Sequence, residues 1–155
     1  MSATLVMLFT LSGLLPQAAP VLPQAAIDAF TPAERKRLAA AAKVDDRIKV
    51  YTSAIIDRRR MVSAGMSGPD PQPVSEMLKS WTVILDYALE DIQANAGRKS
   101  RSRPLRRFEI ELRKALGELD DLKVKGTFEQ MQEIESWMEH AEQIRSATVG
   151  ILFPG

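Results

Sequence analysis

Six basic side chains stand close together between positions 98 and 107, with no acidic residue among them. Guanidinium and ammonium groups gathered in one place attract phosphate groups, anionic lipid headgroups and polyanions. Nucleic acid is not an expected partner, because base stacking needs aromatic side chains between the basic ones, and only Phe108 lies close. We therefore predict a candidate anion-binding site made of Arg98, Lys99, Arg101, Arg103, Arg106 and Arg107.

A second interpretation gives the same residues a purely structural role. In it, residues 98–107 form a solvated loop between two helices, and the cations pair with Asp86, Glu90 and Asp91 nearby. One physical argument counts against this interpretation. The basic run leads into a helix start, where the helix dipole disfavours positive charge. The two interpretations stay open as alternatives.

Other site chemistry is limited because His140 is the only histidine and cysteine is absent. These counts exclude zinc sites built from several such ligands, iron–sulfur clusters and thiol nucleophiles. A di-iron bundle needs Glu three residues before each His, where Trp137 stands. A Ser-His-Asp triad would need His140 beside Ser136 or another serine. Haem held by His140 and a methionine is an alternative, although methionine usually fills the core. We predict a partly exposed His140, no cofactor and no metal.

The acidic side chains near the C-terminus are interpreted as a solvated helix face. A catalytic pair of carboxylates needs a concave pocket that separates their pKa values, and a narrow bundle offers little room for one. The sequence also has no phosphate loop, dinucleotide fingerprint or nucleophile elbow. We therefore expect no enzymatic activity, including from Glu133, Glu135, Glu139 and Glu142.

Helix signals after residue 30 predict the elements that position these residues. Thr31 and Glu34 have the spacing of a capping box, with a short helix running to about Lys43. Asp45 and Asp46 are candidate acidic caps for a second helix. A further capping box at residues 127–130 predicts the start of the last helix.

Apolar residues recur at helical spacing along the chain. Breaker-rich segments at 65–73 and near 97–104 separate the helices, and no stretch alternates with a period of two. We predict an all-α fold, an antiparallel bundle of about four to five helices over residues 31–150 with a short tail at 151–155. The clearest apolar stripe consists of Leu105, Phe108, Leu112, Ala115, Leu119 and Leu122.

The N-terminal segment has the layout of an export signal. Residues 4–15 carry no charge, and every Lys and Arg follows Thr31. This run is shorter than the roughly 20 residues that cross a membrane, but it fits a signal-peptide core. Ala19, Ala25 and Ala26 are candidate cleavage positions. We predict that residues 1–26 are a signal peptide or an N-terminal anchor, with an ordinary core helix as the third alternative, and that the protein is exported, periplasmic or secreted.

Charge is distributed unevenly although the net charge is only +1. Residues 31–67 carry +5 and residues 98–107 carry +6, whereas residues 68–97 and 126–155 carry −4 each. Opposed signs on separate helices favour some pairings of neighbours over others. We interpret the layout as a device that helps select the topology of the bundle.

Two stretches, residues 46–51 and 88–109, resemble a group of uncharacterised bacterial proteins that are helical and exported. The resemblance implies no activity. We expect a non-enzymatic protein-interaction or structural component of the cell envelope, whose partner is another envelope protein or a second copy of the chain. Binding of an anionic surface through residues 98–107 is one alternative. A periplasmic chaperone is another, because Thr31-x-x-Glu34 and Thr127-x-x-Gln130 echo the repeated motif of helical stress chaperones.

Overall fold

The computed structural model describes residues 21–68, 74–95 and 102–155. These ranges form six α-helices and no strand, so the all-α prediction is confirmed. A short helix ahead of residue 31 raises the number of helices above the four to five expected. The helices are α1 (Gln24–Ala29), α2 (Pro32–Ala40), α3 (Val44–Ser67), α4 (Ser75–Asn95), α5 (Arg103–Lys123) and α6 (Phe128–Leu152).

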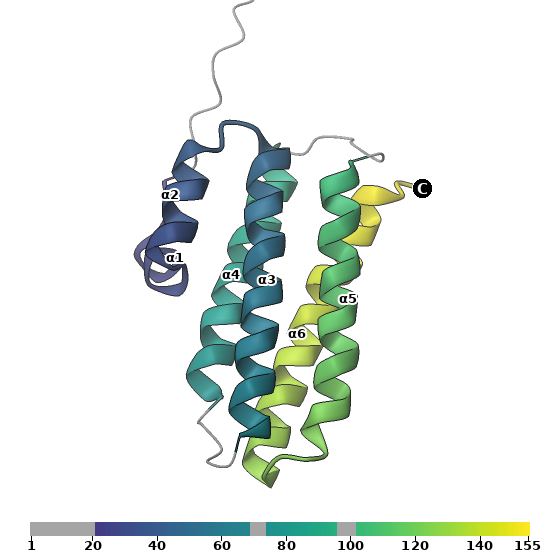
Figure 1. Ribbon diagram of the computed structural model, residues 1–155. Helices are drawn as coiled ribbons and strands as arrows, with labels where there is room; N and C mark the ends of the chain where they lie inside the picture. Colours follow the sequence, from purple (N-terminus) through teal and green to yellow (C-terminus); the bar gives the residue numbers. More distant parts are fainter. Residues whose placement is uncertain (1–20, 69–73, 96–101) are drawn as a thin grey trace, which may run out of the picture.

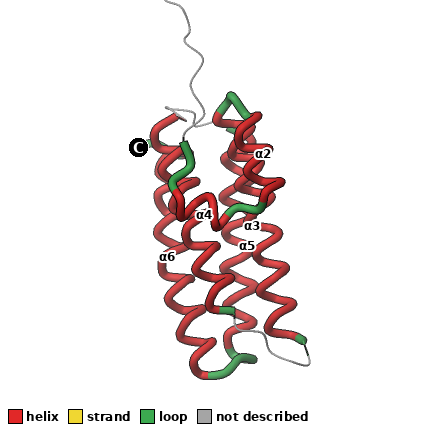
Figure 2. Tube along the Cα trace, turned by 90° about the vertical axis from the view of Figure 1, so that its left-hand side faces the viewer, coloured by secondary structure: helices red, strands yellow, loops and turns green. Residues whose placement is uncertain are grey.

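Four long helices form the bundle as two antiparallel hairpins, α3 with α4 and α5 with α6 (Figures 1 and 2). The hairpins pack with α3 against α5 and α4 against α6. Both of these contacts join helices that run in the same direction, because α4 ends and α5 begins at the same end of the bundle. The predicted antiparallel packing therefore holds within each hairpin and not between the hairpins. Helices α1 and α2 lie outside, against α4 and α3 respectively.

Both predicted capping boxes are confirmed. The Thr31 hydroxyl accepts from the backbone N–H of Glu34 at 3.2 Å, and the Glu34 carboxylate accepts from the backbone N–H of Thr31 at 2.7 Å. Thr127 and Gln130 make the same pair of bonds at the start of α6. These bonds satisfy backbone donors that a helix start otherwise leaves unpaired.

The start and end of α3 differ from the prediction. Its N-cap is Lys43, whose side chain makes no capping bond, so Asp45 and Asp46 lie in the first turn instead of capping the helix. Acidic groups in that position still interact favourably with the helix dipole. At its other end α3 continues through Gly65, which the prediction placed in a loop, as far as Ser67. Gly65 is buried, so packing against the bundle extends the helix.

The bundle extends further at both ends than residues 31–150. At the start, Ala26, Ala29 and Phe30 are buried in the core, so cleavage after Ala25 or Ala26 would remove the first turn of α1. At the other end α6 continues to Leu152, which is 1% exposed. The predicted apolar run 4–15 and Ala19 lie outside the described residues. In the described ranges no helix has the length and apolar character to cross a membrane.

The core follows the predicted stripes most closely on α5, where all six residues of the stripe are buried. Trp81 of α4 and Trp137 of α6 lie against each other, with ring centroids 4.1 Å apart. Phe30, Tyr51 and Tyr87 form a second aromatic cluster, with centroids 5.9–6.2 Å apart. Burial of each large apolar side chain contributes about 1.5–3 kcal/mol, so these contacts dominate the packing of the helices. Met77, Leu89 and Met138 lie at the edge of the core and are half-buried.

Candidate anion-binding groove

The structure describes half of the predicted anion-binding residues. Arg103, Arg106 and Arg107 are exposed on the first turns of α5. None of the three forms an ion pair or a side-chain hydrogen bond with another described residue. Arg98, Lys99 and Arg101 lie outside the described residues.

The acidic partners of the structural alternative are largely engaged elsewhere. Asp91 is buried and binds Arg47, and Asp86 contacts His140 of α6. For the three described arginines, the predicted pairing with Asp86, Glu90 or Asp91 is wrong, because none of them forms an ion pair with these carboxylates. Their guanidinium groups are held at the surface, and no carboxylate of the described part of the chain forms an ion pair with them.

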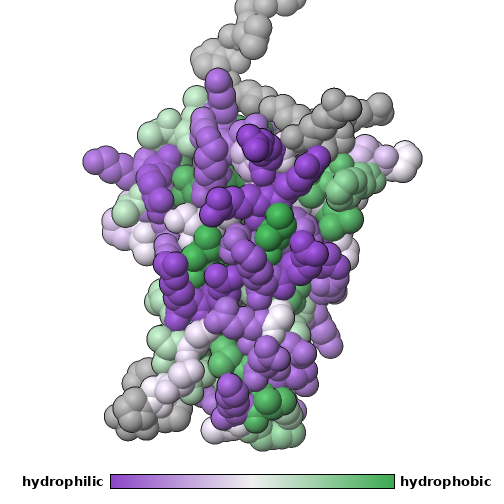
Figure 3. All heavy atoms as spheres, turned by 45° about the vertical axis from the view of Figure 1, so that its right-hand side comes forward, coloured by the Kyte–Doolittle hydropathy of each residue, from purple (hydrophilic) through white to green (hydrophobic). Residues whose placement is uncertain are grey.

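A groove between α3 and α5 brings some of these cations together with residues of α3. Its volume is about 470 Å³, and it is lined by Lys49, Thr52, Ser53, Ile56, Arg103, Pro104 and Arg107. The spacing of 49, 52, 53 and 56 places the four α3 residues on one helix face. Strongly hydrophilic side chains cover much of the upper bundle on the side that carries α5, with separate apolar groups between them (Figure 3). We call this cavity the α3/α5 groove.

Local hydrogen bonds fix the geometry of the α3/α5 groove. Ser102, the N-cap of α5, accepts from the backbone N–H of Leu105 at 3.3 Å and donates to Asp45 of α3 at 3.1 Å. This residue therefore both starts α5 and ties it to the first turn of α3. Lys49 at the rim of the groove donates to Asp46 at 2.7 Å, and this hydrogen bond raises the pKa of Lys49.

A second groove, of about 450 Å³, shares Arg103 and Arg107 with the α3/α5 groove, and one acidic residue, Glu111, lines it. Glu111 accepts from Lys114 at 3.0 Å and from Arg59 at 3.4 Å. The carboxylate offsets the local positive charge. No acidic residue lines the α3/α5 groove, so that groove offers the better site for an anion.

A third groove, of about 510 Å³ between α4 and α6, contains His140. The prediction of a partly exposed histidine is confirmed, because 34% of its side chain is exposed. Ser136 lines the same groove, but within the described residues its hydroxyl makes no hydrogen bond to the imidazole. His140 contacts Asp86 without a nucleophile in place, so a Ser-His-Asp triad is not assembled there.

Two charged networks inside the bundle were missed by the sequence prediction. In the first, Arg47 donates to both carboxylate oxygens of Asp91, at 2.7 and 2.9 Å. Tyr51 donates to the same carboxylate at 2.7 Å, and Asn95 donates at 2.7 Å. Burial by itself would raise the pKa of Asp91, but these donors outweigh it and hold the pKa below its ordinary value. The signal in the sequence is a charged residue on an apolar helix face, Asp91 between Ala88 and Ile92.

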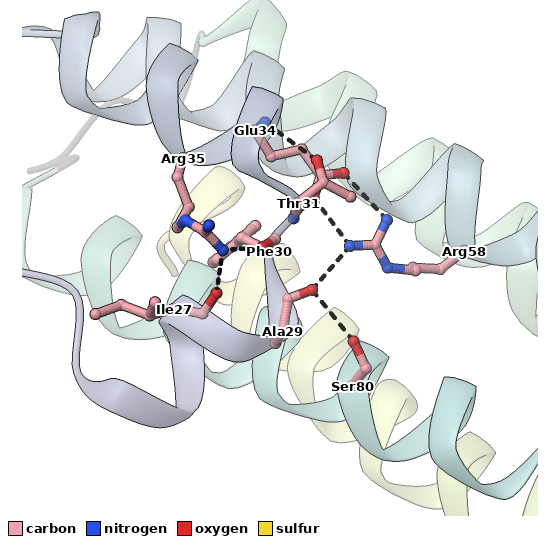
Figure 4. A network of polar contacts seen from close by, with 8 residues as sticks. All are labelled: Ile27, Ala29, Phe30, Thr31, Glu34, Arg35, Arg58 and Ser80. Carbon is pink, nitrogen blue, oxygen red and sulfur yellow. Dashed lines mark hydrogen bonds and ion pairs between the residues drawn. The ribbon is translucent and has the colours of Figure 1, made fainter.

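The second network fastens α1 and α2 to the bundle (Figure 4). Arg58 donates to Glu34 at 2.9 and 3.1 Å and to the backbone carbonyl of Ala29 at 2.8 Å. Arg35 donates to the carbonyls of Ile27 and Phe30. The last carbonyls of a helix lack partners within it, so these two arginines complete the end of α1. Burial by itself would raise the pKa of Glu34, but hydrogen bonds from Arg58 and the Thr31 backbone outweigh it and lower the pKa.

The triplet 58–60 shows how one helix separates these roles. Three consecutive helical residues span 200°, so the sequence predicts that at most one points inward. Arg58 is 5% exposed, while Arg59 pairs with Glu111 and Glu118 of α5 at 3.4 and 3.2 Å. The Arg60 side chain is 74% exposed beside Asp57. The prediction is confirmed.

The α3/α5 groove and the bundle around it define an all-helical protein with a cationic surface groove. Within the described residues there is no group of three or more side chains arranged to hold a metal ion. A scan of protein-family models, a search of curated proteins and a search of solved structures each found no match. The resemblance to uncharacterised exported proteins stays a prediction.

Proposed function

We propose that this protein is a non-enzymatic, exported helical-bundle protein that attaches to an anionic surface of the cell envelope through the α3/α5 groove. One observation carries the proposal. Arg103 and Arg107 line the groove, Arg106 is exposed beside them on the same helix end, and none of the three forms an ion pair with another described residue. Arginine presents planar donors that match phosphate oxygens, so this arrangement suits a surface of phosphate groups.

Binding is a better explanation than catalysis for the other polar groups. The buried carboxylates with the most hydrogen-bond donors, Asp91 and Glu34, hold helices together. A catalytic acid or base needs a free position toward a substrate, and these two lie at 4% and 2% exposure inside the bundle. Their chemistry is structural.

An envelope protein or a second copy of the chain is the competing partner, and a chaperone role is a further alternative. A chaperone needs a continuous apolar surface for unfolded chains. Two of the large exposed apolar residues of the described ranges, Val124 and Phe128, flank the turn between α5 and α6. The other four belong to other parts of the chain: Val21, Met61, Ile110 and Phe153. The cationic groove therefore has more support as the binding surface.

Vesicle co-sedimentation of the full chain tests the proposal. Vesicles of phosphatidylcholine alone measure any contribution of the apolar N-terminal run, and vesicles with one quarter phosphatidylglycerol measure anionic attraction. Each Lys or Arg at an anionic membrane contributes about 1 kcal/mol. Replacement of Arg103, Arg106 and Arg107 by Gln should therefore weaken binding to the anionic vesicles on the order of 100-fold.

The matched control replaces three exposed cations elsewhere, Lys36, Arg37 and Lys125, by Gln. It changes the net charge equally, but these three cations lie outside the α3/α5 groove. This control variant should therefore weaken vesicle binding much less. Equal losses for the two triple variants would show that only net charge matters and would overturn the assignment to the groove. Absence of any preference for anionic vesicles would overturn the proposed function and leave a protein partner as the better explanation.

A further inference from the structure

Resting on the proposed function, we infer that the α3/α5 groove holds a single amphipathic anion, the phosphate headgroup of one anionic phospholipid together with the start of its apolar chain. The cations and a hydroxyl hold the phosphate, and Ile56 and Pro104 contact the apolar part. The groove thus recognises one lipid molecule and does more than attract a charged surface.

The polar part of the groove has a donor available besides the cations. Ser53 is half-buried, lines the groove, and its hydroxyl has no hydrogen-bond partner within the described residues. The neighbouring Thr52 hydroxyl already donates to the Ile48 carbonyl at 2.8 Å. Ser53 can therefore donate to a phosphate oxygen beside the guanidinium groups of Arg103 and Arg107.

The apolar part of the groove selects the class of anion. Along α3 the lining changes from Lys49 through Ser53 to Ile56, from charged to apolar within two turns. Pro104 adds apolar surface from α5. A free phosphate or a sugar polyanion would leave these side chains exposed to water, whereas an acyl or glyceryl chain would cover them.

The size of the groove agrees with such a ligand. Its volume of about 470 Å³ lies within the roughly 300–1,000 Å³ of small-molecule sites. A lone phosphate would fill only a small part of it. The neighbouring groove has a similar volume, but Glu111 lines it and would repel the headgroup.

Titration with dissolved short-chain lipid tests this inference on the full chain. The probes are monomeric dihexanoyl-phosphatidylglycerol and glycerol 3-phosphate, which share the phosphate and differ in the chains. Wild type should bind the lipid more tightly. Ile56→Thr replaces the ethyl group of the side chain by a hydroxyl and should weaken lipid binding by at least roughly fourfold, the effect of one buried methylene, without changing glycerol 3-phosphate binding. Ser53→Ala and Arg107→Gln should weaken binding of both probes.

Matched variants keep the test decisive. Ile110→Thr makes the same change on the neighbouring groove and should leave both affinities unchanged. Pro104→Ala trims the second apolar wall at a helix position that tolerates alanine, so it replaces Ile56→Thr if that variant unfolds. It should weaken lipid binding selectively.

Two outcomes would overturn the inference while the proposed function stands. One is equal affinity for the two probes, unaffected by Ile56→Thr and Pro104→Ala, with anionic vesicles still bound. The other is binding of a heparin fragment, dependent on Arg107, with no binding of dissolved lipid. Failure of the proposed function is distinguishable from both, because vesicle binding itself would then be insensitive to Arg103, Arg106 and Arg107.

Discussion

Two sets of arginines in this molecule have opposite environments. Arg47 and Arg58 lie inside the bundle, with side chains 2% and 6% exposed, and each binds both oxygens of a carboxylate. Arg103, Arg106 and Arg107 stand on the surface without an acidic partner among the described residues. The partner therefore distinguishes the roles: a paired, buried arginine holds helices together, and an exposed one without a partner is available for a ligand.

The energetic consequences of the two environments also differ. Arg47 adds bonds to the carbonyls of Ala41 and Ala42, both at 3.2 Å, so its donors are largely satisfied. Removal of its partner would leave a charge in the interior, which is costly. The cations at the start of α5 instead lie where the helix dipole disfavours them. They contribute nothing evident to folding, and this is why a binding role explains them better.

The strongest test of the comparison is Asp91→Ala. It removes the carboxylate that Arg47, Tyr51 and Asn95 share, and it leaves a buried guanidinium without a counter-charge. The free energy of unfolding should fall by about 3–5 kcal/mol. Urea denaturation followed by circular dichroism measures this change. Asp46→Ala, which removes the exposed pair with Lys49 and a favourable contact with the α3 dipole, is the control and should cost much less. Similar losses for both would contradict the distinction between buried and exposed pairs.

A more local effect is expected from Glu34→Ala. Arg58 loses its carboxylate but keeps the Ala29 carbonyl, so the expected cost is about 2–3 kcal/mol. Amide hydrogen exchange should accelerate in α1 and α2 and stay unchanged in α5 and α6, because Glu34 fastens only the outer helices. Asp57→Ala, which breaks an exposed pair with Arg60, is the control. Uniform acceleration over all helices would show that α1 and α2 are integral to the bundle's cooperative unit.

Acid should weaken the contribution of the buried ion pairs to stability and leave the exposed arginines, which pair with no carboxylate among the described residues, unaffected. The folded protein lowers the pKa of Glu34 below 4.5, its ordinary value. Its unfolded state therefore binds a proton first, and the stabilisation is present above pH 4.5 and lost as the pH falls through the folded pKa. The stability difference between wild type and Glu34→Gln should stay constant from pH 7 to about 5.5 and narrow below pH 4.5. A difference that grows with acid would contradict the lowered pKa.

The sequence predicted the helical parts that depend on local chemistry. Capping needs only a side chain and a backbone three residues apart, so the boxes at Thr31 and Thr127 could be read directly. The stripe on α5 was equally clear, since burial follows helical periodicity. The contact of α3 with α5 could not be predicted, because short connections determine the direction of successive helices but not which helices become neighbours.

The candidate site was predictable as a set of charges but not as a groove. The basic run identified Arg103, Arg106 and Arg107, while their α3 neighbours Ser53 and Ile56 carry no signal of their own. Asp91 is instructive in the opposite sense. The structural interpretation of the basic run makes Asp91 a surface partner, although its position on the Ala88–Ile92 face indicates burial. A charged residue on an apolar stripe requires a buried partner, and Arg47, between Val44 and Tyr51 on one helix face, has the same signature.

The smallest effect on the free energy of unfolding is expected for the variant that should weaken vesicle binding most, the triple change at the start of α5. The triple change of Arg103, Arg106 and Arg107 to Gln breaks no ion pair among the described residues and removes charges that oppose the α5 dipole. The free energy of unfolding should be unchanged or rise by less than about 1 kcal/mol. Urea denaturation checks this on the same protein used for vesicle binding. A clear loss of stability would mean that these cations have structural partners, and the two sets of arginines would then differ in burial only. If stability is unchanged and vesicle binding is lost, the exposed arginines bind a ligand, whereas the buried arginines stabilise the fold.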